Sequence, residues 1–180
     1  MPYHFKIVNA GDGGVGKTTF LKRYTIGQFV EDSKETIGTG FFTKTLYDET
    51  KNRKERIDLT IWDFGGQKRF RHIIKDFVMG AAGALLFFDL TRYESFEHLE
   101  DWIRILRANE TGEKELPIIL VGSKLDLTDL IVVKDDEIAD FVEKHDLIGY
   151  ISTSAKTGDN VANAVKILVE YIFEKNKGVF

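Results

Sequence analysis

Short apolar runs alternate along this chain of 180 residues with longer segments of helical period. The runs 84–89 and 118–122 are almost entirely apolar, which is typical of strands buried on both faces. This alternation predicts parallel strands joined by helical crossovers, and therefore an α/β fold. The expected strands are Tyr3–Asn9, Gly40–Tyr47, Arg56–Asp63, Ala84–Asp89, Ile118–Gly122 and Gly149–Ser152.

Helical segments carry apolar residues at three- or four-residue spacing. They are expected from about residue 17 to Gly27, and at Ser95–Ala108, Asp135–His145 and Asn160–Lys175. The charged stretch 48–56 predicts an exposed hairpin that pairs the second strand antiparallel to the third. We therefore expect a three-layer fold of the P-loop NTPase type, with a six-stranded, mostly parallel sheet, one antiparallel edge strand and about five helices. Segments 26–38 and 64–80 have weaker patterns and are expected to be mobile.

The composition predicts one globular domain over residues 1–180, with 43% hydrophobic and 30% charged residues. A formal net charge of −4 argues against nucleic acid as a partner. The sequence has no cysteine, which excludes disulfides, thiolate metal sites and cysteine-linked lipids. We expect a cytoplasmic monomer without an intrinsic membrane anchor, which reaches membranes only through a partner or a tail absent from this chain.

Residues 11–18 match the pattern GxxxxGK[ST] between an apolar run and a helical segment. That context predicts a P-loop, in which backbone N–H groups and a helix start surround phosphates. Lys17 is expected to reach the β- and γ-phosphates, and Thr18 to bind Mg²⁺. The motif alone does not choose between ATP and GTP. The predicted phosphate site contains Gly11, Asp12, Gly13, Gly14, Val15, Gly16, Lys17, Thr18 and Thr19.

A second motif, Asp-Phe-Gly-Gly-Gln at residues 63–67, follows the expected third strand. Asp63 is suited to Mg²⁺, usually through a water, because that ion prefers oxygen ligands and retains its waters. Gly66 is placed to offer its N–H to a γ-phosphate, and Gln67 to orient an attacking water. An ordinary loop turn is the alternative interpretation of this motif.

Two further motifs indicate a binding site for the base of a nucleotide. Asp126 ends the run Ser-Lys-Leu-Asp after the fifth expected strand, at the edge where open α/β sheets bind ligands. Its carboxylate suits the N1–H and N2–H₂ pair of guanine, which adenine lacks. In Ser154-Ala155-Lys156, the N–H of Ala155 is suited to guanine O6. Either motif taken alone also fits a plain polar loop.

Together these motifs resemble those of small GTPases of the Ras superfamily, in the same order and over essentially the whole length. The resemblance implies a switch that binds GTP or GDP with Mg²⁺. It implies that Thr36 joins Thr18 and Asp63 at the metal, and that Gln67 works beside Gly13. It further implies that Phe29 packs edgewise on the base. The implied base contacts are Ser123, Lys124, Asp126, Ser154, Ala155 and Lys156.

Within the superfamily the chain is most similar to Rab proteins, which implies roles in signalling and vesicle trafficking. Phe41, Trp62 and Phe77 match the aromatic triad that binds effectors in that group, and core packing is the alternative for these rings. The resemblance also implies activating and exchange proteins as partners, acting through the segments around Thr36 and Gln67, the two switch regions.

Several positions depart from the Rab pattern. Phe64-Gly65 resembles Arf proteins and Gα subunits instead, and Ser123 replaces the usual Asn of the base motif. Ser33 stands where Gα subunits carry a catalytic arginine, so activation needs a partner's arginine. The chain also lacks a cysteine-bearing tail, a feature similar to prokaryotic, including archaeal, Ras-like GTPases, unless a tail was removed.

We therefore expect slow hydrolysis of GTP by direct attack of water, with Lys17, Gly66 and Gln67 as the catalytic groups. Two alternatives stay open. One is a nucleotide-locked interaction module that hardly hydrolyses GTP. The other is a P-loop ATPase or small-molecule kinase, which Asp126 disfavours.

Overall fold

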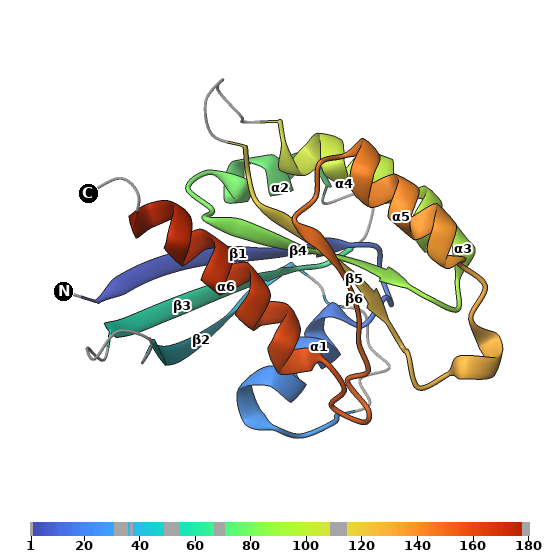
Figure 1. The fold of residues 1–180 in the computed structure, drawn as a ribbon, viewed down its shortest axis with the longest axis horizontal. Helices are drawn as coiled ribbons and strands as arrows, with labels where there is room; N and C mark the ends of the chain where they lie inside the picture. Colours follow the sequence, from blue (N-terminus) through green and yellow to red (C-terminus); the bar gives the residue numbers. More distant parts are fainter. Residues whose placement is uncertain are drawn as a thin grey trace.

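The computed structural model describes residues 2–30, 36, 38–48, 55–66, 71–108 and 115–177. Within these residues a six-stranded sheet has the order β2-β3-β1-β4-β5-β6 (Figure 1). Its strands are β1 (Tyr3–Gly11), β2 (Thr39–Asp48), β3 (Glu55–Phe64), β4 (Gly83–Asp89), β5 (Ile118–Ser123) and β6 (Gly149–Ser152). All six expected strands are therefore present, with ends that differ by at most two residues from those expected.

The sheet is parallel except at one edge, where β2 pairs antiparallel with β3 from Thr39↔Phe64 to Asp48↔Glu55. This pairing confirms the expected antiparallel edge strand. The tip of the expected hairpin, residues 49–54, lies outside the described residues.

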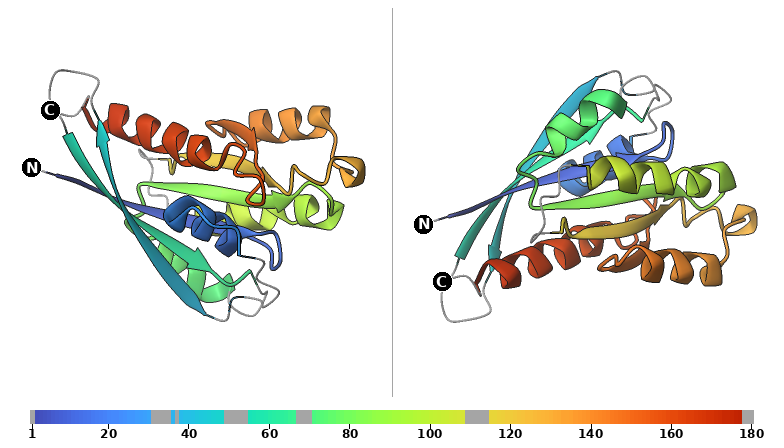
Figure 2. Two further views of the ribbon diagram at one scale, coloured as in Figure 1. Left: turned by 90° about the horizontal axis from the view of Figure 1, so that it is seen from below. Right: turned by 90° about the horizontal axis from the view of Figure 1, so that it is seen from above.

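Helices cover both faces of the sheet, as the two views in Figure 2 make clear. The residues of α1 and α6 share one apolar cluster with the sheet, and those of α2 to α5 share the other. This arrangement confirms the expected three layers. The helices are α1 (Lys17–Ile26), α2 (Arg71–Val78), α3 (Tyr93–Glu97), α4 (Leu99–Leu106), α5 (Asp135–Lys144) and α6 (Val161–Lys177), with a short 3₁₀ turn, η2 (Thr128–Leu130).

Two features of the helical layer differ from the sequence prediction. The single helix expected at Ser95–Ala108 is divided into α3 and α4 at His98. There the N–H of Asp101 bonds to the carbonyl of His98, an i to i+3 bond that tightens the turn. Helix α2 was not expected, because glycines and charges around it obscure its apolar face.

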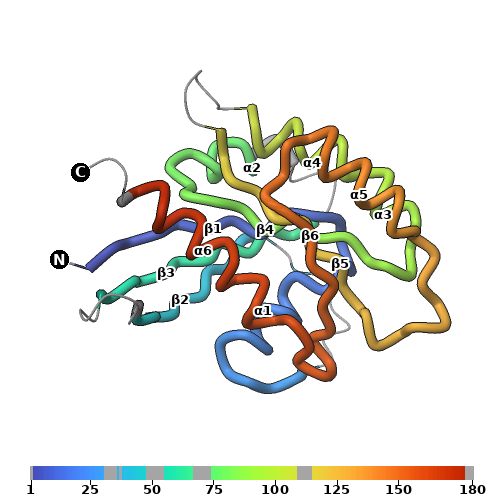
Figure 3. The backbone as a smooth tube through the Cα atoms, viewed as in Figure 1, coloured from blue at the N-terminus to red at the C-terminus, as the bar shows by residue number. Residues whose placement is uncertain are grey.

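The parallel strands bring their carboxyl ends to one edge of the sheet, where ligands bind in folds of this type. The backbone passes from β1 through residues 12–16 into α1 at this edge (Figure 3). At the opposite edge the ring of Tyr3 packs edge-on against that of Phe173, with centroids 4.8 Å apart, so α6 is fixed beside the start of β1. None of the helices in the described ranges is long and apolar enough to span a membrane.

Candidate nucleotide-binding site

The loop between β1 and α1 depends on glycine backbone conformations. Gly14 and Gly16 have φ of +75° and +91°, values that residues with a side chain rarely adopt. Gly16 precedes α1 directly, and no side chain caps this end of the helix. The N–H groups of the first turn are therefore presented at the loop, together with the positive end of the helix dipole. This geometry suits a phosphate group.

Lys17 is buried beneath the same loop, with 6% of its surface exposed. Its ammonium Nζ donates hydrogen bonds of 2.7 Å to the carbonyl oxygens of both Gly11 and Asp12. The Lys17 side chain therefore turns toward the start of the loop, and its positive charge lies at the predicted phosphate-binding site. The ammonium lies at the loop whose backbone N–H groups are presented to a ligand, and its positive charge suits a negatively charged ligand there.

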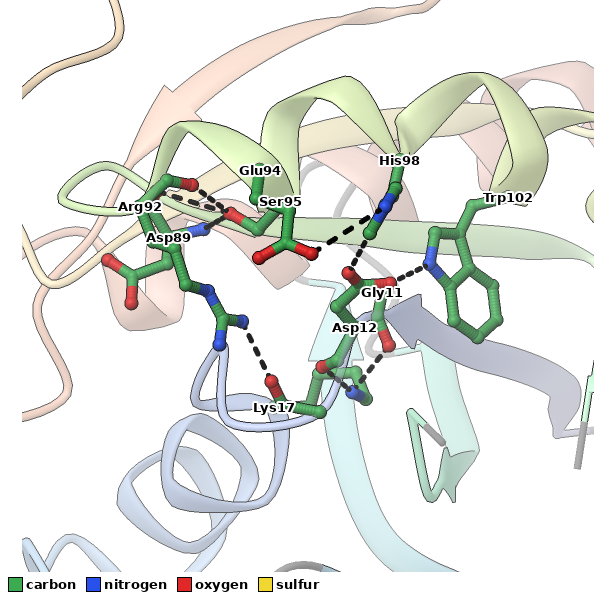
Figure 4. Close-up of polar contacts among 10 residues, drawn as sticks. Gly11, Asp12, Lys17, Asp89, Arg92, Glu94, Ser95, His98 and Trp102 are labelled. Carbon is green, nitrogen blue, oxygen red and sulfur yellow. Dashed lines mark hydrogen bonds and ion pairs between the residues drawn. The ribbon is translucent and has the colours of Figure 1, made fainter. Parts of the chain in front are cut away.

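Side chains from Arg92 to Trp102, a range that includes α3 and the start of α4, form hydrogen bonds with the loop between β1 and α1 (Figure 4). Trp102 Nε1 donates to Asp12 Oδ1 at 2.8 Å, and His98 Nδ1 lies 2.5 Å from Asp12 Oδ2. Arg92 Nη2 donates to the carbonyl oxygen of Gly13 at 2.7 Å. We call Asp12, His98, Trp102 and Arg92 the loop anchor. It fixes both the side chain and the backbone of the loop's first residues.

The three residues expected at the metal come together from three separate segments. Thr18 Oγ1 lies 2.7 Å from Thr36 Oγ1 and also donates to Asp63 Oδ2. Burial raises the pKa of the Asp63 carboxyl, while the Thr18 hydroxyl and the nearby Lys17 and Lys22 charges act in the opposite direction. The second carboxylate oxygen, Asp63 Oδ1, is buried and has no hydrogen-bond partner within the part of the chain that the structure describes. Two hydroxyls and a carboxylate with a spare oxygen fit a Mg²⁺ ion and its waters.

The glycine pair after β3 touches both the loop and the Thr36 segment. A Cβ on Gly66 would lie 2.2 Å from the backbone of Asp12 and Gly13, and a Cβ on Gly65 would lie 2.4 Å from the carbonyl of Thr36. Gly65 also donates its N–H to the carbonyl of Gly38 at 3.0 Å. Only glycine fits here, because the obstructing atoms are backbone. Gln67, the expected water-positioning residue, lies outside the described residues.

The expected base site forms at the ends of β5 and β6. Ser154 is fully buried, and its hydroxyl donates to Asp126 Oδ1 at 2.6 Å. Lys124 Nζ lies 2.5 Å from Asp89 Oδ2 at the end of β4. Although burial favours the neutral carboxyl, bonds from Lys124 and Thr91 hold the pKa of Asp89 below its ordinary value. The two base motifs are thus connected, and the position of Lys124 is fixed by a charge.

Ser123, an expected base contact, bonds to the loop before α1. Its buried Oγ lies 2.6 Å from the carbonyl oxygen of Val15 and 2.9 Å from that of Phe88. The hydroxyl proton can bond either carbonyl, so Ser123 connects β5 to the loop before α1. The Ser123 hydroxyl therefore stabilises the loop through the Val15 carbonyl. Its neighbours in the sequence are the residues of the base motif.

The remaining expected residues differ in their exposure. Val15 is fully buried, Ala155 and Thr19 are half-buried, and Lys156 is exposed. Phe29 has 39% of its surface exposed. Its ring is thus accessible where the resemblance expects it to meet a base.

Phe41, Trp62 and Phe77 form a continuous row over β2, β3 and α2, which we call the aromatic surface. Ring centroids are 6.2 Å apart for Phe41 and Trp62, and 5.6 Å for Trp62 and Phe77. Phe41 is 67% exposed, whereas the other two rings are half-buried. The three rings therefore pack against one another, and the row still exposes Phe41 on the surface.

Sequence reasoning missed several residues that shape the site. Asp89 carries a recognisable signal, a carboxylate directly after a fully apolar strand. Arg92, His98 and Trp102, which lie before α3, between α3 and α4, and within α4, carry none, because their contacts with the loop span about half the chain. Asn9, a buried carboxamide on β1, was also missed.

Comparison with known proteins agrees with this geometry. The model of the Ras family matches residues 6–174. The Ras-related protein RABA4b of Arabidopsis thaliana is 40% identical over 171 residues, which cover 95% of this chain and 73% of that protein. The Ras-related protein Rab-11A of Dictyostelium discoideum is 40% identical over 171 residues, with coverage of 95% and 77%. RABA1c of Arabidopsis thaliana is 42% identical over 162 residues, with coverage of 90% and 72%.

These matches extend over the loop, both base motifs and the strands that carry them, and they agree with the sheet order and the layers described above. The chain therefore belongs to the Ras family of small GTPases, the GTP hydrolases that act as GTP-binding molecular switches, and within that family it is Rab-like.

Proposed function

We propose that this chain is a Mg²⁺-dependent switch that hydrolyses GTP slowly and changes the segments around Thr36 and Gly66 as it does so. The observation that carries this proposal is the meeting of Thr18, Thr36 and Asp63 oxygens at the loop. These residues come from α1, the segment before β2 and the end of β3. A shared ion would make the position of Thr36 depend on the ligand.

Mg²⁺ held by these oxygens would supply positive charge next to the β- and γ-phosphates. Lys17 Nζ binds phosphate oxygens in exchange for the carbonyls of Gly11 and Asp12 that it now contacts. The N–H of Gly66 donates to the γ-phosphate, and Gln67 orients the attacking water. The residues position and stabilise charge, and none forms a covalent bond.

Switching follows from the contacts of the glycine pair. The Gly65–Gly38 hydrogen bond connects the end of β3 to the segment that holds Thr36. Loss of the γ-phosphate would remove the bonds to Gly66 and Thr36 together, so both segments would be released in one event. By analogy with the family, intrinsic hydrolysis is expected on the order of 10⁻⁴ to 10⁻³ s⁻¹.

Specificity for guanine is assigned to Asp126, which Ser154 holds in place. Adenine offers no N1–H and N2–H₂ donor pair to this half-buried carboxylate, so ATP would leave it without hydrogen bonds from the base. In this proposal Lys124, which Asp89 holds by an ion pair, and the exposed ring of Phe29 would flank the base.

The aromatic surface is the proposed docking site for effector, activating and exchange proteins, since β2 follows the segment around Thr36, and β3 and α2 precede and follow the segment around Gly66. We propose a single domain over residues 1–180 that acts as a monomer in the cytoplasm. Any association with membranes would then depend on a partner or on a tail outside this chain, and a role in vesicle trafficking would be exercised through those partners.

The test is to identify the nucleotide released when the purified protein is denatured, and then to measure single-turnover phosphate release from GTP. We expect GDP or GTP, competition by GTP but not ATP, and phosphate release that requires Mg²⁺. Bound GTP without phosphate release would favour a nucleotide-locked module. Displacement of labelled GDP by ATP would overturn the assignment of Asp126.

A further inference from the structure

Asn9 is a polar side chain inside the core of β1. It is fully buried, and among the described residues neither its carboxamide oxygen nor its nitrogen has a hydrogen-bond partner. Leaving a buried polar group without a partner typically costs about 1–3 kcal/mol. An aliphatic residue would avoid that cost, because Ile7, Ile61 and Leu85, which lie on the same face of the sheet, are buried and apolar.

The register places Asn9 directly beside Asp63. In the parallel pair of β1 and β3, Asn9 is the partner of Asp63, and on its other side the partner is Leu85 of β4. Partners in a parallel pair point to the same face of the sheet. The same face carries Ile7 of β1 and Ile61 of β3, both in the cluster under α1 and α6.

Asp63 also has an unsatisfied atom on this face. Its Oδ2 accepts a hydrogen bond from Thr18, at the start of α1, whereas Oδ1 is buried and unpartnered. Two neighbouring side chains therefore carry complementary groups, an amide donor on Asn9 and a carboxylate acceptor on Asp63. The terminal torsion of an asparagine rotates over a broad range at low cost, so a small rotation can join them.

We propose that Asn9 is a positioning residue for Asp63, which holds the carboxylate by a hydrogen bond from Nδ2 to Oδ1 when Mg²⁺ is bound. This inference rests on the proposed role of Asp63 at the metal and deepens it. An outer-shell amide fixes the orientation of the carboxylate, so that its other oxygen faces the ion's water shell. Asn9 itself does not touch the ion or the nucleotide.

A structural role alone does not explain the residue. The site lies between two strands whose neighbouring positions are filled by buried aliphatic side chains, so packing does not require a carboxamide. A polar side chain at this one position, beside the only carboxylate of the Thr18–Thr36–Asp63 group, is instead expected if it serves that carboxylate.

The test compares the full chain with Asn9→Leu, a variant whose side chain has the same number and branching of heavy atoms but lacks the amide. The rate of dissociation of a fluorescent GDP analogue is measured over a range of Mg²⁺ concentrations, with thermal unfolding as a check of the fold. We expect Asn9→Leu to remain folded and to need about 10-fold more Mg²⁺ for half-maximal slowing of release, since outer-shell changes commonly weaken metal binding by 10–100-fold. Ile7→Leu, on the same strand and face, is the matched control and should leave the Mg²⁺ midpoint unchanged.

A double-mutant cycle with Asp63→Asn separates positioning from repacking. If Asn9 acts through Asp63, adding Asn9→Leu to Asp63→Asn should shift the Mg²⁺ midpoint less than twofold further. An equal shift in both backgrounds, or an unchanged midpoint in Asn9→Leu, would overturn the inference. The dependence of GDP release on Mg²⁺ in the wild type tests the proposed function separately. A wild-type release rate that does not change with Mg²⁺ would refute the metal site, whatever the variants do.

Discussion

Trp102 donates a hydrogen bond of 2.8 Å from its indole Nε1 to Asp12 Oδ1, joining the middle of α4 to the loop before α1 (Figure 4). The Trp102 side chain is fully buried, and His98 occupies the other oxygen of the same carboxylate. Since Arg92 also holds the carbonyl of Gly13, the loop cannot move outward without breaking contacts with α3 and α4. Movement of these helices is therefore coupled to the shape of the phosphate cradle.

Trp102→Phe should weaken this coupling while it preserves most of the buried ring. Loss of a hydrogen bond to a charged group is expected to lower the free energy of unfolding by about 1.5–3 kcal/mol. GDP release should become about 3- to 10-fold faster, because the loop loses one of its anchors. Urea unfolding and the release of a fluorescent GDP analogue measure the two effects.

The same substitution in an Asp12→Ala background provides the control. Without the carboxylate, Trp102→Phe should cost only the packing difference between the two rings. Equal losses in both backgrounds would show that Trp102 acts through packing and not through Asp12.

Gly66→Ala should disrupt the contact between the end of β3 and the loop. The added Cβ would lie 2.2 Å from backbone atoms of Asp12 and Gly13, which cannot rotate away as a side chain can. We expect a loss of about 1–3 kcal/mol in the free energy of unfolding, and phosphate release reduced at least 10-fold. Chemical unfolding and single-turnover assays measure these changes.

Gly40→Ala is the matched control, because a Cβ at that position meets nothing within 4 Å. It should match the wild type in hydrolysis and change the stability by less than about 0.5 kcal/mol. If both alanine variants behave alike, the close approach at Gly66 is not what limits the site.

The fold was predictable because its signals are local. The apolar run of β4 identifies a buried strand without any partner, and the charged stretch after β2 identifies a hairpin. Helix α2 was missed because the glycines and charges next to it resemble a loop. The break at His98 was missed because the apolar spacing continues from α3 into α4 across the tightened turn.

The site was predictable where chemistry resides in a contiguous motif. The loop glycines, Lys17 and Asp126 could be found from spacing alone, and the structure brings Thr36 to Thr18 as expected. The loop anchor could not be found, since Asp12 and Trp102 are 90 positions apart and each has an ordinary local context. The bond from Ser123 to Val15 likewise depends on how β5 packs beside the loop.

Gln67→Leu should impair hydrolysis and leave nucleotide binding intact. Leucine fills a similar volume but has neither the acceptor nor the donor needed to orient water. We expect phosphate release to fall by at least 10-fold at unchanged GDP affinity, measured by single turnover and equilibrium titration. Lys17→Ala provides the contrast, because it should lose nucleotide altogether. Equal turnover by Gln67→Leu and the wild type would refute the role of the glutamine.

Ser123→Ala should weaken the attachment of the loop before α1 to β5. The variant removes the hydroxyl that bonds the Val15 carbonyl, and this carbonyl would be left buried with one partner fewer. The expected cost is about 1 kcal/mol of stability and a GDP release rate about 5-fold faster. Ser123→Thr keeps the hydroxyl and should retain the wild-type release rate. If Ser123→Ala releases GDP no faster than the wild type, the bond to Val15 does not stabilise the nucleotide site.

Asp89→Asn should destabilise the protein in a way that depends on pH. Lys124 and Thr91 hold the pKa of Asp89 below its ordinary value, so the ionised carboxylate stabilises the folded state. That contribution is fully present above the ordinary pKa and is lost as the pH falls through the folded-state pKa. The wild type should therefore exceed Asp89→Asn by about 1–3 kcal/mol near pH 7, and the difference should shrink below about pH 4.

Glu100→Gln is the control, since Glu100 also pairs with a lysine, Lys144, and its pKa is lowered by that contact. The Glu100 side chain is 41% exposed, whereas that of Asp89 is 3% exposed. A solvated pair is worth at most about 1 kcal/mol, so this substitution should change urea unfolding little at any pH. Added salt should weaken the Glu100 contribution more than that of Asp89, because dissolved ions screen an exposed pair more strongly than a partly buried one. A loss in Asp89→Asn that stays constant from neutral to acidic pH would indicate that the carboxylate charge does not hold Lys124.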